Sequence, residues 1–311
     1  MDFASSSSSS THQNELHALK FYRYHTTRKC WKHVTLREES DQRPLHHDIA
    51  IITWNIDFTG LQVIERMQGA LEYLQHEILK GKTPPPCVIL LQEVHSKAMI
   101  ELRSNTWVRK HFYITPIDNL KWPYPNIYGN VTLIERSVSV KELVFYTLRR
   151  RALVTDIRLA PREPELYHGK RDVTVRVINT HLESLETGHG PVYRADQLFL
   201  CVELLKEESV YGGVIGGDFN AIDEDSTEQV RDYGLIDPGE PNEYTNEQES
   251  HTWGFHEKKP WKYPTGRLDK IIFTPRGELM VEAPDIFGQD AKTEEGDWVS
   301  DHFGLVTDLH L

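Results

Sequence analysis

The stretch Val214-Ile215-Gly216-Gly217-Asp218-Phe219-Asn220 indicates both how this chain folds and where its chemistry lies. Val214 and Ile215 are typical of the end of a buried strand. The two glycines let the backbone pass close to a neighbouring group, and Asp218 and Asn220, at alternate positions of an extended segment, point the same way. Gly, Asp and Asn are also common in turns, so the stretch alone fits a strand-to-loop turn as well as a site.

Short apolar runs elsewhere predict the other strands of a buried sheet. The expected strands are residues 49–54, 88–91, 131–134, 143–148, 153–159, 173–178, 271–273 and 305–309. Between the first two, apolar residues recur at steps of three and four from Ile64 to Ile78, which predicts an amphipathic helix that Gly81 ends. A strand, a helix and a second strand in this order are typical of a crossover in a buried sheet.

Two further helices are expected in the second half of the chain. One carries the apolar stripe Leu198, Cys201, Leu204 and Leu205, and a short one covers residues 227–233 within the otherwise polar and irregular segment 223–262. Residues 45–311 contain neither an internal repeat nor a linker. We therefore predict a single α/β domain over residues 45–311.

The first 44 residues have a different character. Residues 1–20 include six consecutive serines and have little to bury, which predicts a disordered tail. Residues 21–44 form an N-terminal arm in which aromatic side chains mix with Arg23, Arg28 and Lys29. The arm fits two interpretations, a basic contact with a partner or a strand or loop that covers the domain.

Composition limits the classes of function. The formal net charge of −12 argues against a broad surface that coats nucleic acid, and leaves room for a local basic groove. Three scattered cysteines have no spacing for zinc or disulfides, so we expect a reducing, intracellular compartment, the nucleus or the cytoplasm. No apolar run reaches membrane-spanning length, and the N-terminus lacks an apolar signal core. We expect a monomer.

Polar residues lie at the ends of five of the expected strands and precede a sixth. They are Asn55, Glu93, Asn179 with His181, Asp218 with Asn220, Asp301 with His302, and Asp269. Each alone fits a solvated strand end, a turn or a satisfied core histidine. Ligands of α/β sheets bind at strand ends, and this set contains no Cys-His or Gly-x-Ser-x-Gly nucleophile. The set suits Mg²⁺-assisted hydrolysis of a phosphoester, in which water attacks.

The order of these motifs resembles the endonuclease/exonuclease/phosphatase superfamily over residues 45–311. The matching motifs are Thr53-Trp54-Asn55, Leu91-Gln92-Glu93, Asn179-Thr180-His181-Leu182, Gly217-Asp218-Phe219-Asn220, Leu268-Asp269 and Ser300-Asp301-His302. The resemblance implies a four-layer α/β sandwich, in which two packed mixed β-sheets are flanked by helices.

Three segments are more specific and resemble the branch that hydrolyses 5′-phosphotyrosyl-DNA linkages. They are Thr53-Trp54-Asn55-Ile56-Asp57, His181-Leu182-Glu183-Ser184 followed by Arg194 and Gln197, and Ser300-Asp301-His302-Phe303-Gly304-Leu305. This resemblance implies a Mg²⁺-dependent phosphodiesterase of DNA repair that removes topoisomerase adducts, with Mn²⁺ as the alternative ion. Its partner would be a DNA 5′ end that carries a tyrosyl peptide.

The resemblance, together with the chemistry of the side chains, gives each residue an expected role. Glu93 would be the main Mg²⁺ ligand, with Asn55 and Asp301 near the metal or its waters. Asp218 would deprotonate the attacking water, and Asn220 would hold that water or a phosphate oxygen. His302 and His181 would bind the phosphate, and Asp269 would orient His302.

Four further residues, Arg151, Trp253, Ser184 and Asn179, are expected to contact the substrate. Arg151 ends the basic run Arg149-Arg150-Arg151. Trp253 lies in His251-Thr252-Trp253-Gly254, where its indole either stacks on a 5′ nucleotide or pins a loop to the core. Ile222 departs from the branch, which usually has an arginine at this place, so an expected contact with the DNA backbone is missing.

Other functions stay open on the same fold. Alternative substrates are abasic-site DNA, RNA 3′ ends, and phosphoinositides or phospholipids. Phe303-Gly304 stands where abasic-site endonucleases often have Ser/Cys-Pro, and the extra basic phosphate clamp of inositol phosphatases is missing. An inactive binding scaffold is a third alternative, which the presence of every named catalytic residue argues against.

Overall fold

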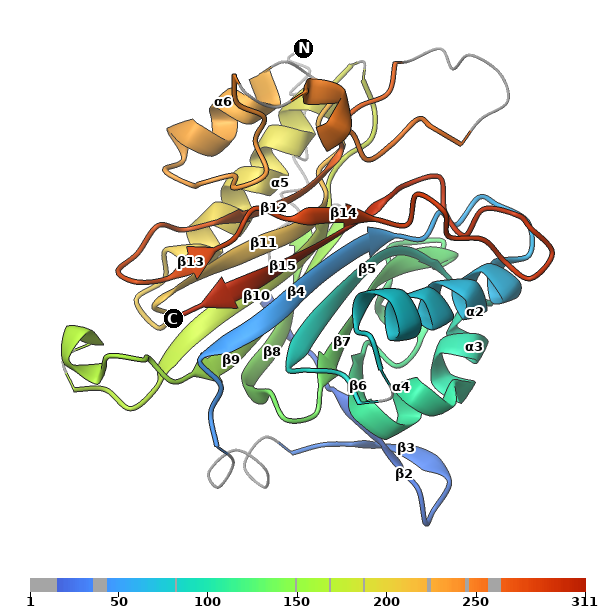
Figure 1. Ribbon diagram of the computed structural model, residues 1–311, viewed down its shortest axis with the longest axis horizontal. Helices are drawn as coiled ribbons and strands as arrows, with labels where there is room; N and C mark the ends of the chain where they lie inside the picture. The colour runs from blue at the N-terminus through green and yellow to red at the C-terminus, as the bar shows by residue number, and fades with distance from the viewer. Residues whose placement is uncertain are drawn as a thin grey trace, which may run out of the picture.

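Two β-sheets pack face to face, and helices cover their outer faces (Figure 1). The computed structural model describes residues 16–35, 44–81, 83–148, 150–167, 169–186, 188–222, 225–243, 246–256 and 264–311. Helix, sheet, sheet and helix follow one another as layers. The expected four-layer α/β sandwich is confirmed.

Within the described residues, the larger sheet has nine strands in the order β13-β15-β4-β5-β7-β6-β2-β3, with β14 beside β15. Among these described strands β4 and β5 are the parallel pair, as expected for a crossover. The strands are β2 (Tyr22–His25), β3 (Cys30–His33), β4 (Asp48–Asn55), β5 (Cys87–His95), β6 (Phe112–Thr115), β7 (Tyr128–Glu135), β13 (Met280–Val281), β14 (Asp285–Phe287) and β15 (Gly304–His310).

In the part of the chain that the structure describes, the second sheet has six strands in the order β1-β8-β9-β10-β11-β12. Here β10 and β11 are the parallel pair. The strands are β1 (Leu16–Ala18), β8 (Ser139–Leu148), β9 (Arg150–Leu159), β10 (Val173–His181), β11 (Gly212–Asp218) and β12 (Asp269–Phe273). Each sheet therefore contributes one parallel pair to the centre of the fold, and these two pairs supply most of the polar strand ends predicted from the sequence.

Helices cover each sheet from outside. On the nine-stranded sheet lie α2 (Val63–Tyr73), which continues as the π-helical turn η1 (Leu74–Ile78), α3 (Met99–Ser104) and α4 (Thr106–His111). On the six-stranded sheet lie α5 (Gly190–Leu205) and α6 (Asp225–Asp232). Short 3₁₀ turns occupy Asn119–Lys121, Pro164–Tyr167 and Glu247–Ser250. No helix in the described part of the chain is long and apolar enough to cross a membrane.

The side chains of strand β4 show why the layers form. Ile49 and Ile51 pack between the two sheets, whereas Ile52 and Trp54 pack under the helices. Side chains alternate along a strand, so a strand that is apolar at every position buries both of its faces. A continuous apolar run therefore needs a second sheet on one side and helices on the other.

Two expectations differ from the structure, and the arm takes one of its two expected forms. Disorder up to residue 20 is wrong for the last part of the tail, because Leu16–Ala18 pairs with β8 as an edge strand and Leu19 donates its backbone N–H to the Leu143 carbonyl at 3.0 Å. Ile64 is 36% exposed, so the buried stripe of α2 begins at Met67. The arm forms the β2–β3 hairpin. Residues 1–15 and 36–43 lie outside the described residues.

Candidate active site

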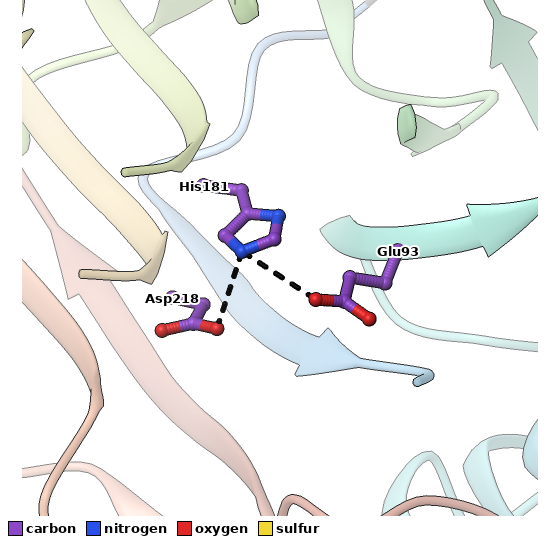
Figure 2. Close-up of side chains that lie close together, drawn as sticks. All are labelled: Glu93, His181 and Asp218. Carbon is purple, nitrogen blue, oxygen red and sulfur yellow. Dashed lines mark ion pairs between the residues drawn. The ribbon is translucent and has the colours of Figure 1, made fainter. Parts of the chain in front are cut away.

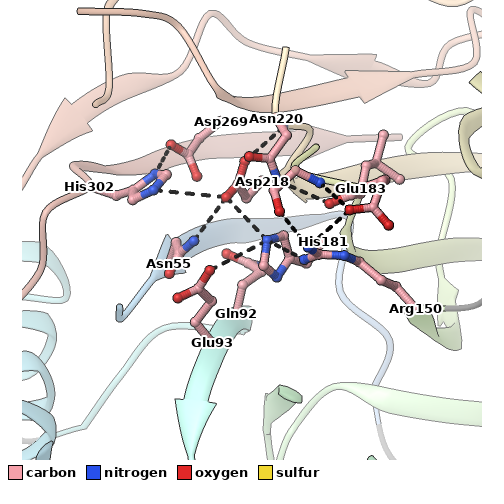
Figure 3. A network of polar contacts seen from close by, with 12 residues as sticks. Asn55, Gln92, Glu93, Arg150, His181, Glu183, Asp218, Asn220, Asp269 and His302 are labelled. Carbon is pink, nitrogen blue, oxygen red and sulfur yellow. Dashed lines mark hydrogen bonds and ion pairs between the residues drawn. The ribbon is translucent and has the colours of Figure 1, made fainter. Parts of the chain in front are cut away.

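The ends of four strands, two from each sheet, meet at one place (Figure 3). From the nine-stranded sheet, β4 ends at Asn55 and β5 carries Glu93. From the six-stranded sheet, β10 ends at His181 and β11 at Asp218, and these two residues are neighbours in the parallel ladder. Since parallel strands bring their carboxyl ends to the same edge, residues far apart in sequence become neighbours here.

Asp218 lies at the centre of this group and is buried. Its Oδ2 accepts a hydrogen bond from Asn55 Nδ2 at 2.9 Å, and its Oδ1 accepts one from the Asn220 backbone N–H at 2.8 Å. The same Oδ2 lies 3.5 Å from His181 Nε2 and 3.9 Å from His302 Nε2. Burial raises the pKa of Asp218 to about 6, so the carboxylate holds a proton more readily than an exposed one.

Gly217 explains how Asp218 reaches this position. Its φ is +148°, and a Cβ there would lie 1.9 Å from the Thr180 carbonyl oxygen. The close approach of backbones expected from the two glycines is therefore present, and it seats Asp218 beside His181.

Glu93 faces Asp218 across the site. A bulge between Leu91 and Val94 interrupts the pairing of β5 with β7, and Glu93 takes a left-handed φ of 54°. Its Oε2 accepts a hydrogen bond from the Phe58 backbone N–H at 3.1 Å. Burial raises the pKa of Glu93 to about 7; the charge of His302 opposes this rise and that of Asp218 adds to it. Bulges are often found where a strand aims a side chain into a site.

His302 and Asp269 form a buried pair. His302 Nδ1 lies 2.8 Å from Asp269 Oδ2. Burial alone would lower the pKa of His302, but the negative charges of Asp269, Asp301 and Asp218 raise it well above its usual value. The imidazole is therefore a cation at neutral pH, and its Nε2 points toward Asp218.

His181 has the opposite character (Figure 2). Its Nε2 lies 3.5 Å from both Glu93 Oε1 and Asp218 Oδ2, and it accepts a hydrogen bond from Arg150 Nη1 at 2.7 Å. Burial, followed by the positive charges of Arg150 and His302, lowers the pKa of His181 well below its usual value. His181 is thus neutral, and Arg150 supplies the positive charge on this side.

A pocket of about 480 Å³ opens over these groups. It is lined by Glu93, Asp218, Asn220, Asp301 and His302, and also by Ser184, Ile222 and Trp253. The Trp253 indole donates a hydrogen bond to Asp301 Oδ2 at 3.0 Å, and its ring centre lies 6.4 Å from that of His302. Trp253 therefore lines the pocket and ties down the loop that carries Asp301 and His302.

One expected substrate contact, that of Asn179, is corrected by the structure. Asn179 is fully buried between the sheets, where its Oδ1 accepts from Gln92 Nε2 at 2.9 Å and its Nδ2 donates to the Val131 carbonyl at 3.0 Å. It connects the sheets and does not line the pocket.

Arg151 lies away from the main pocket. Its guanidinium stacks over the Phe145 ring at 4.9 Å, and its buried Nη1 has no hydrogen-bond partner among the described residues. It lines a second pocket, of about 260 Å³, on the other side of His181 and Arg150. Arg149, the first residue of this basic run, lies outside the described residues.

Sequence analysis missed three residues that shape the site. Arg150 bonds to His181 and to Ser184 Oγ, the latter at 2.7 Å. Gln92 joins Thr53 to Asn179 across the sheets. Arg66 donates to the carbonyls of Ile56 and Val299, which fixes the loops beside Asn55 and Ser300. Gln92 and Arg150 stand in segments that the sequence analysis quoted without giving them a role, and Arg66 appears in the sequence as a charge on the buried side of an amphipathic helix.

The donor set suits a hard divalent cation. Carboxylates of Asp57, Glu93, Glu186, Asp218 and Asp301 line one pocket. Glu93, His181 and Asp218 each offer one ligand atom, and these three atoms lie within 4.8 Å of one another. Burial, followed by the nearby charge of Asp218, raises the pKa of Glu93, and a bound cation would stabilise the charged form of such a carboxylate. Oxygen ligands of this kind are those that Mg²⁺ prefers.

The chain belongs to the Endonuclease/Exonuclease/phosphatase family, whose model matches residues 52–302. Members of this family are mostly phosphoesterases and nucleases that use a divalent metal ion. A comparison with curated proteins found no match.

Several solved structures share the fold. A D. rerio TDP2 complexed with single strand DNA product is 19% identical with a TM-score of 0.61; the alignment covers 85% of this chain and 99% of that one. A humanized D. rerio TDP2 is 18% identical with a TM-score of 0.61 and coverages of 85% and 100%. TDP2 from C. elegans is 18% identical with a TM-score of 0.60 and coverages of 86% and 76%. At this identity the likeness shows the fold.

Proposed function

We propose that this protein is a Mg²⁺-dependent phosphodiesterase that hydrolyses 5′-phosphotyrosyl linkages between DNA and a peptide. One observation carries the proposal. Asp218, a buried carboxylate with a pKa of about 6, lies 3.9 Å from the cationic His302 at the wall of an acidic pocket. A base that titrates near neutral pH beside a fixed cation is what attack of water on a phosphodiester requires.

Asp218 would act as the general base. At pH 7 a carboxyl group with this pKa is mostly ionised, and it can still accept a proton from water. Hydrogen bonds from Asn55 and from the Asn220 N–H fix its two oxygens, so the lone pair that takes the proton has a defined direction. The Asn220 side chain donates to the Leu182 carbonyl at 3.0 Å, which leaves its amide oxygen for the water or a phosphate oxygen.

Two cations would bind the phosphate from opposite sides. His302, charged because of Asp269, donates from Nε2, and Arg150 lies on the far side next to the neutral His181. Negative charge grows on the phosphate oxygens during attack, and a fixed donor to such a charge is worth about 2.7–4 kcal/mol.

Glu93, with Asp301 and Asn55 beside it, would hold the Mg²⁺. A bound Mg²⁺ supplies positive charge to the phosphate and to the departing oxygen, which the buried carboxylates alone cannot do. Glu93 is held in place for this role by the β5 bulge and by the Phe58 N–H.

The two pockets suit the two halves of the substrate. The larger one presents Trp253, whose ring can stack on the 5′ nucleotide. The smaller one presents Trp122, Tyr124, Tyr128 and Arg151, which suit an aromatic leaving group such as a tyrosyl side chain. His181 and Arg150 line the smaller pocket, and Arg150 also bonds to Ser184 of the larger one, so a phosphate held there would lie between the halves. The likeness to TDP2, tyrosyl-DNA phosphodiesterase 2, supports the same substrate.

A panel of oligonucleotides tests the proposal. The full chain is assayed on 5′-tyrosyl, 3′-tyrosyl, abasic and unmodified strands, each with Mg²⁺ and with chelator. We expect turnover of the 5′-tyrosyl strand that depends on Mg²⁺ and exceeds the rates on the other strands. Preference for abasic DNA, or equal rates on all four strands, would contradict the substrate assignment.

A further inference from the structure

The proposed function leaves the β2–β3 hairpin unused, although its charge is opposite to that of the whole chain. Residues 20–35 contain five Lys or Arg residues and no Asp or Glu, whereas the chain as a whole has 35 basic and 47 acidic residues. We call Arg23, Arg28, Lys29 and Lys32 the hairpin cation surface. At its base, α4 adds Arg109 and Lys110.

The hairpin is firmly attached to the domain. Its strand β2 pairs with β6, and the Trp31 indole donates to the Arg103 carbonyl at 3.1 Å. The Tyr24 and Trp31 rings meet edge to face at 5.6 Å, and the Arg109 guanidinium lies over Tyr24 at 4.5 Å. The aromatic residues thus hold the hairpin against α3 and α4, and the cations are displayed on a fixed support.

Part of the hairpin cation surface has no acidic partner among the described residues. Arg23 and Lys32 are partners in the β2–β3 ladder, so their side chains leave the same face. Arg28 and Lys29 occupy the exposed turn. Arg28, Lys29 and Lys32 make no ion pair with an acidic residue in the described part of the chain. An anionic polymer lying across the hairpin would neutralise the charges of Arg28, Lys29 and Lys32.

We propose that the hairpin cation surface binds the phosphate backbone of DNA, as a second contact remote from the catalytic pocket. The observations favour DNA over a membrane, because the tip of the hairpin, Thr26-Thr27-Arg28-Lys29, has no apolar side chain to insert into lipid. The aromatic rings of the hairpin are already packed. The choice of DNA as the polymer rests on the proposed function.

The strand register sets the distance between the two contacts. Arg23 pairs with Tyr113, Tyr113 with Ile134, and Ile134 with Val88, which lies five residues before Glu93 on β5. With strands roughly 4.8 Å apart and about 3.3 Å per residue, Arg23 is roughly 20–25 Å from Glu93, and the hairpin tip points farther away. A strand of a few nucleotides in the pocket cannot reach it, whereas a duplex of about 10 base pairs spans about 34 Å.

Charge reversal on the full chain tests the inference. The triple variant Arg28→Glu, Lys29→Glu, Lys32→Glu is compared with Lys141→Glu, Lys170→Glu, Lys206→Glu, which changes the net charge equally at exposed positions elsewhere. The probes are an unmodified duplex of about 30 base pairs, an unmodified six-nucleotide strand, and vesicles with phosphatidylserine. Binding is measured by fluorescence anisotropy for DNA and by sedimentation for vesicles, and turnover of a small chromogenic phosphodiester reports on the catalytic site.

We expect the hairpin variant to bind the long duplex about tenfold more weakly than the control variant, with a salt slope smaller by up to about 2.7, because three phosphate contacts are lost. Binding of the short strand and turnover of the small diester should match the control. Equal binding of the duplex by both variants would overturn the inference, as would a loss confined to the vesicles. Loss of duplex binding by a chain that does not hydrolyse 5′-tyrosyl DNA would support the hairpin contact and refute only the proposed substrate.

Discussion

Glu93 and Asp218 are both carboxylates of the site, Asp218 buried and Glu93 partly buried, yet their surroundings suit them to different tasks. Each carboxylate oxygen of Asp218 accepts a hydrogen bond, one from the Asn55 side chain and one from the Asn220 backbone N–H. These bonds fix the orientation of the carboxylate, which suits a general base. Glu93 accepts a hydrogen bond from Phe58 at one oxygen, and its other oxygen faces His181 at 3.5 Å. An acid with a free oxygen and a pKa near 7 suits a metal ligand, because a cation stabilises its charged form.

Glu93→Gln keeps the size of the side chain and removes its charge. We expect the Mg²⁺ concentration for half-maximal turnover to rise by about 100-fold or more, since even the loss of an outer partner of a metal ligand costs 10–100-fold. A titration of turnover with Mg²⁺ measures the change, and thermal unfolding serves as the control for the fold. Unchanged stimulation by Mg²⁺ in this variant would contradict the assignment of Glu93.

Asp269 and His302 should act as one unit. Without Asp269, His302 loses both its orientation and its charge, so removing the second residue after the first should add little. We expect the double variant Asp269→Asn, His302→Ala to be about as slow as the slower single variant. Rate losses that multiply in the double variant, measured as kcat on a small phosphodiester, would show that the residues work separately.

At the scale of elements, the strands and their polar ends follow directly from the sequence. Apolar runs bounded by polar residues marked β4, β5, β10 and β11, and the ends of parallel strands must meet. The sequence could not tell whether Arg150 or Arg151 faces His181. Neighbouring residues on a strand point to opposite faces, and the pairing with the partner strand decides which face is which. For the same reason, the sequence could not show that the Asn179 side chain points into the space between the sheets.

Asn179 illustrates how one residue supports both sheets. Asn179→Ala leaves Gln92 and the Val131 carbonyl without their buried partner, which should lower the free energy of unfolding by about 1–3 kcal/mol. Urea denaturation measures this loss, with the exposed Ser184→Ala as the control. Unchanged stability together with a raised KM would instead restore the expected role in substrate binding.

The end of β15 carries a pH-dependent contact. His310 Nδ1 lies 2.9 Å from Asp48 on β4, and its Nε2 lies 2.9 Å from Glu282. The hydrogen bond to Asp48 raises the pKa of His310, and burial opposes it. The contact therefore stabilises the fold fully below about pH 6.5, the value for the unfolded chain, and the gain is lost as pH rises through the higher folded pKa.

We expect His310→Gln to lower the free energy of unfolding by about 1 kcal/mol or less at pH 6, because the pair is partly exposed. The difference from the unmodified protein should shrink by pH 9. Urea unfolding at the two pH values measures it. A difference that grows with pH would have the wrong sign for this contact.

At the scale of the whole molecule, the fold places the acidic catalytic pocket and the basic hairpin in separate regions. An acidic pocket lies where strand ends of both sheets meet. The β2–β3 hairpin, which carries the hairpin cation surface, lies at the far edge of the nine-stranded sheet (Figure 1). The net charge of −12 suggested little surface for nucleic acid, yet charge is distributed unevenly over the chain. Folding gathers the basic hairpin and the end of α4 at one place, which the total charge conceals.

The central claim is that water, activated by Asp218, attacks phosphorus and expels the tyrosine phenol. Hydrolysis of a 5′-tyrosyl oligonucleotide in ¹⁸O-labelled water with Mg²⁺, followed by mass spectrometry of both products, tests it most directly. The account predicts one ¹⁸O in the 5′-phosphate of the DNA and none in the released tyrosine, with no product in chelator. Label in the tyrosine, unlabelled phosphate, or full turnover without a divalent metal ion would contradict it.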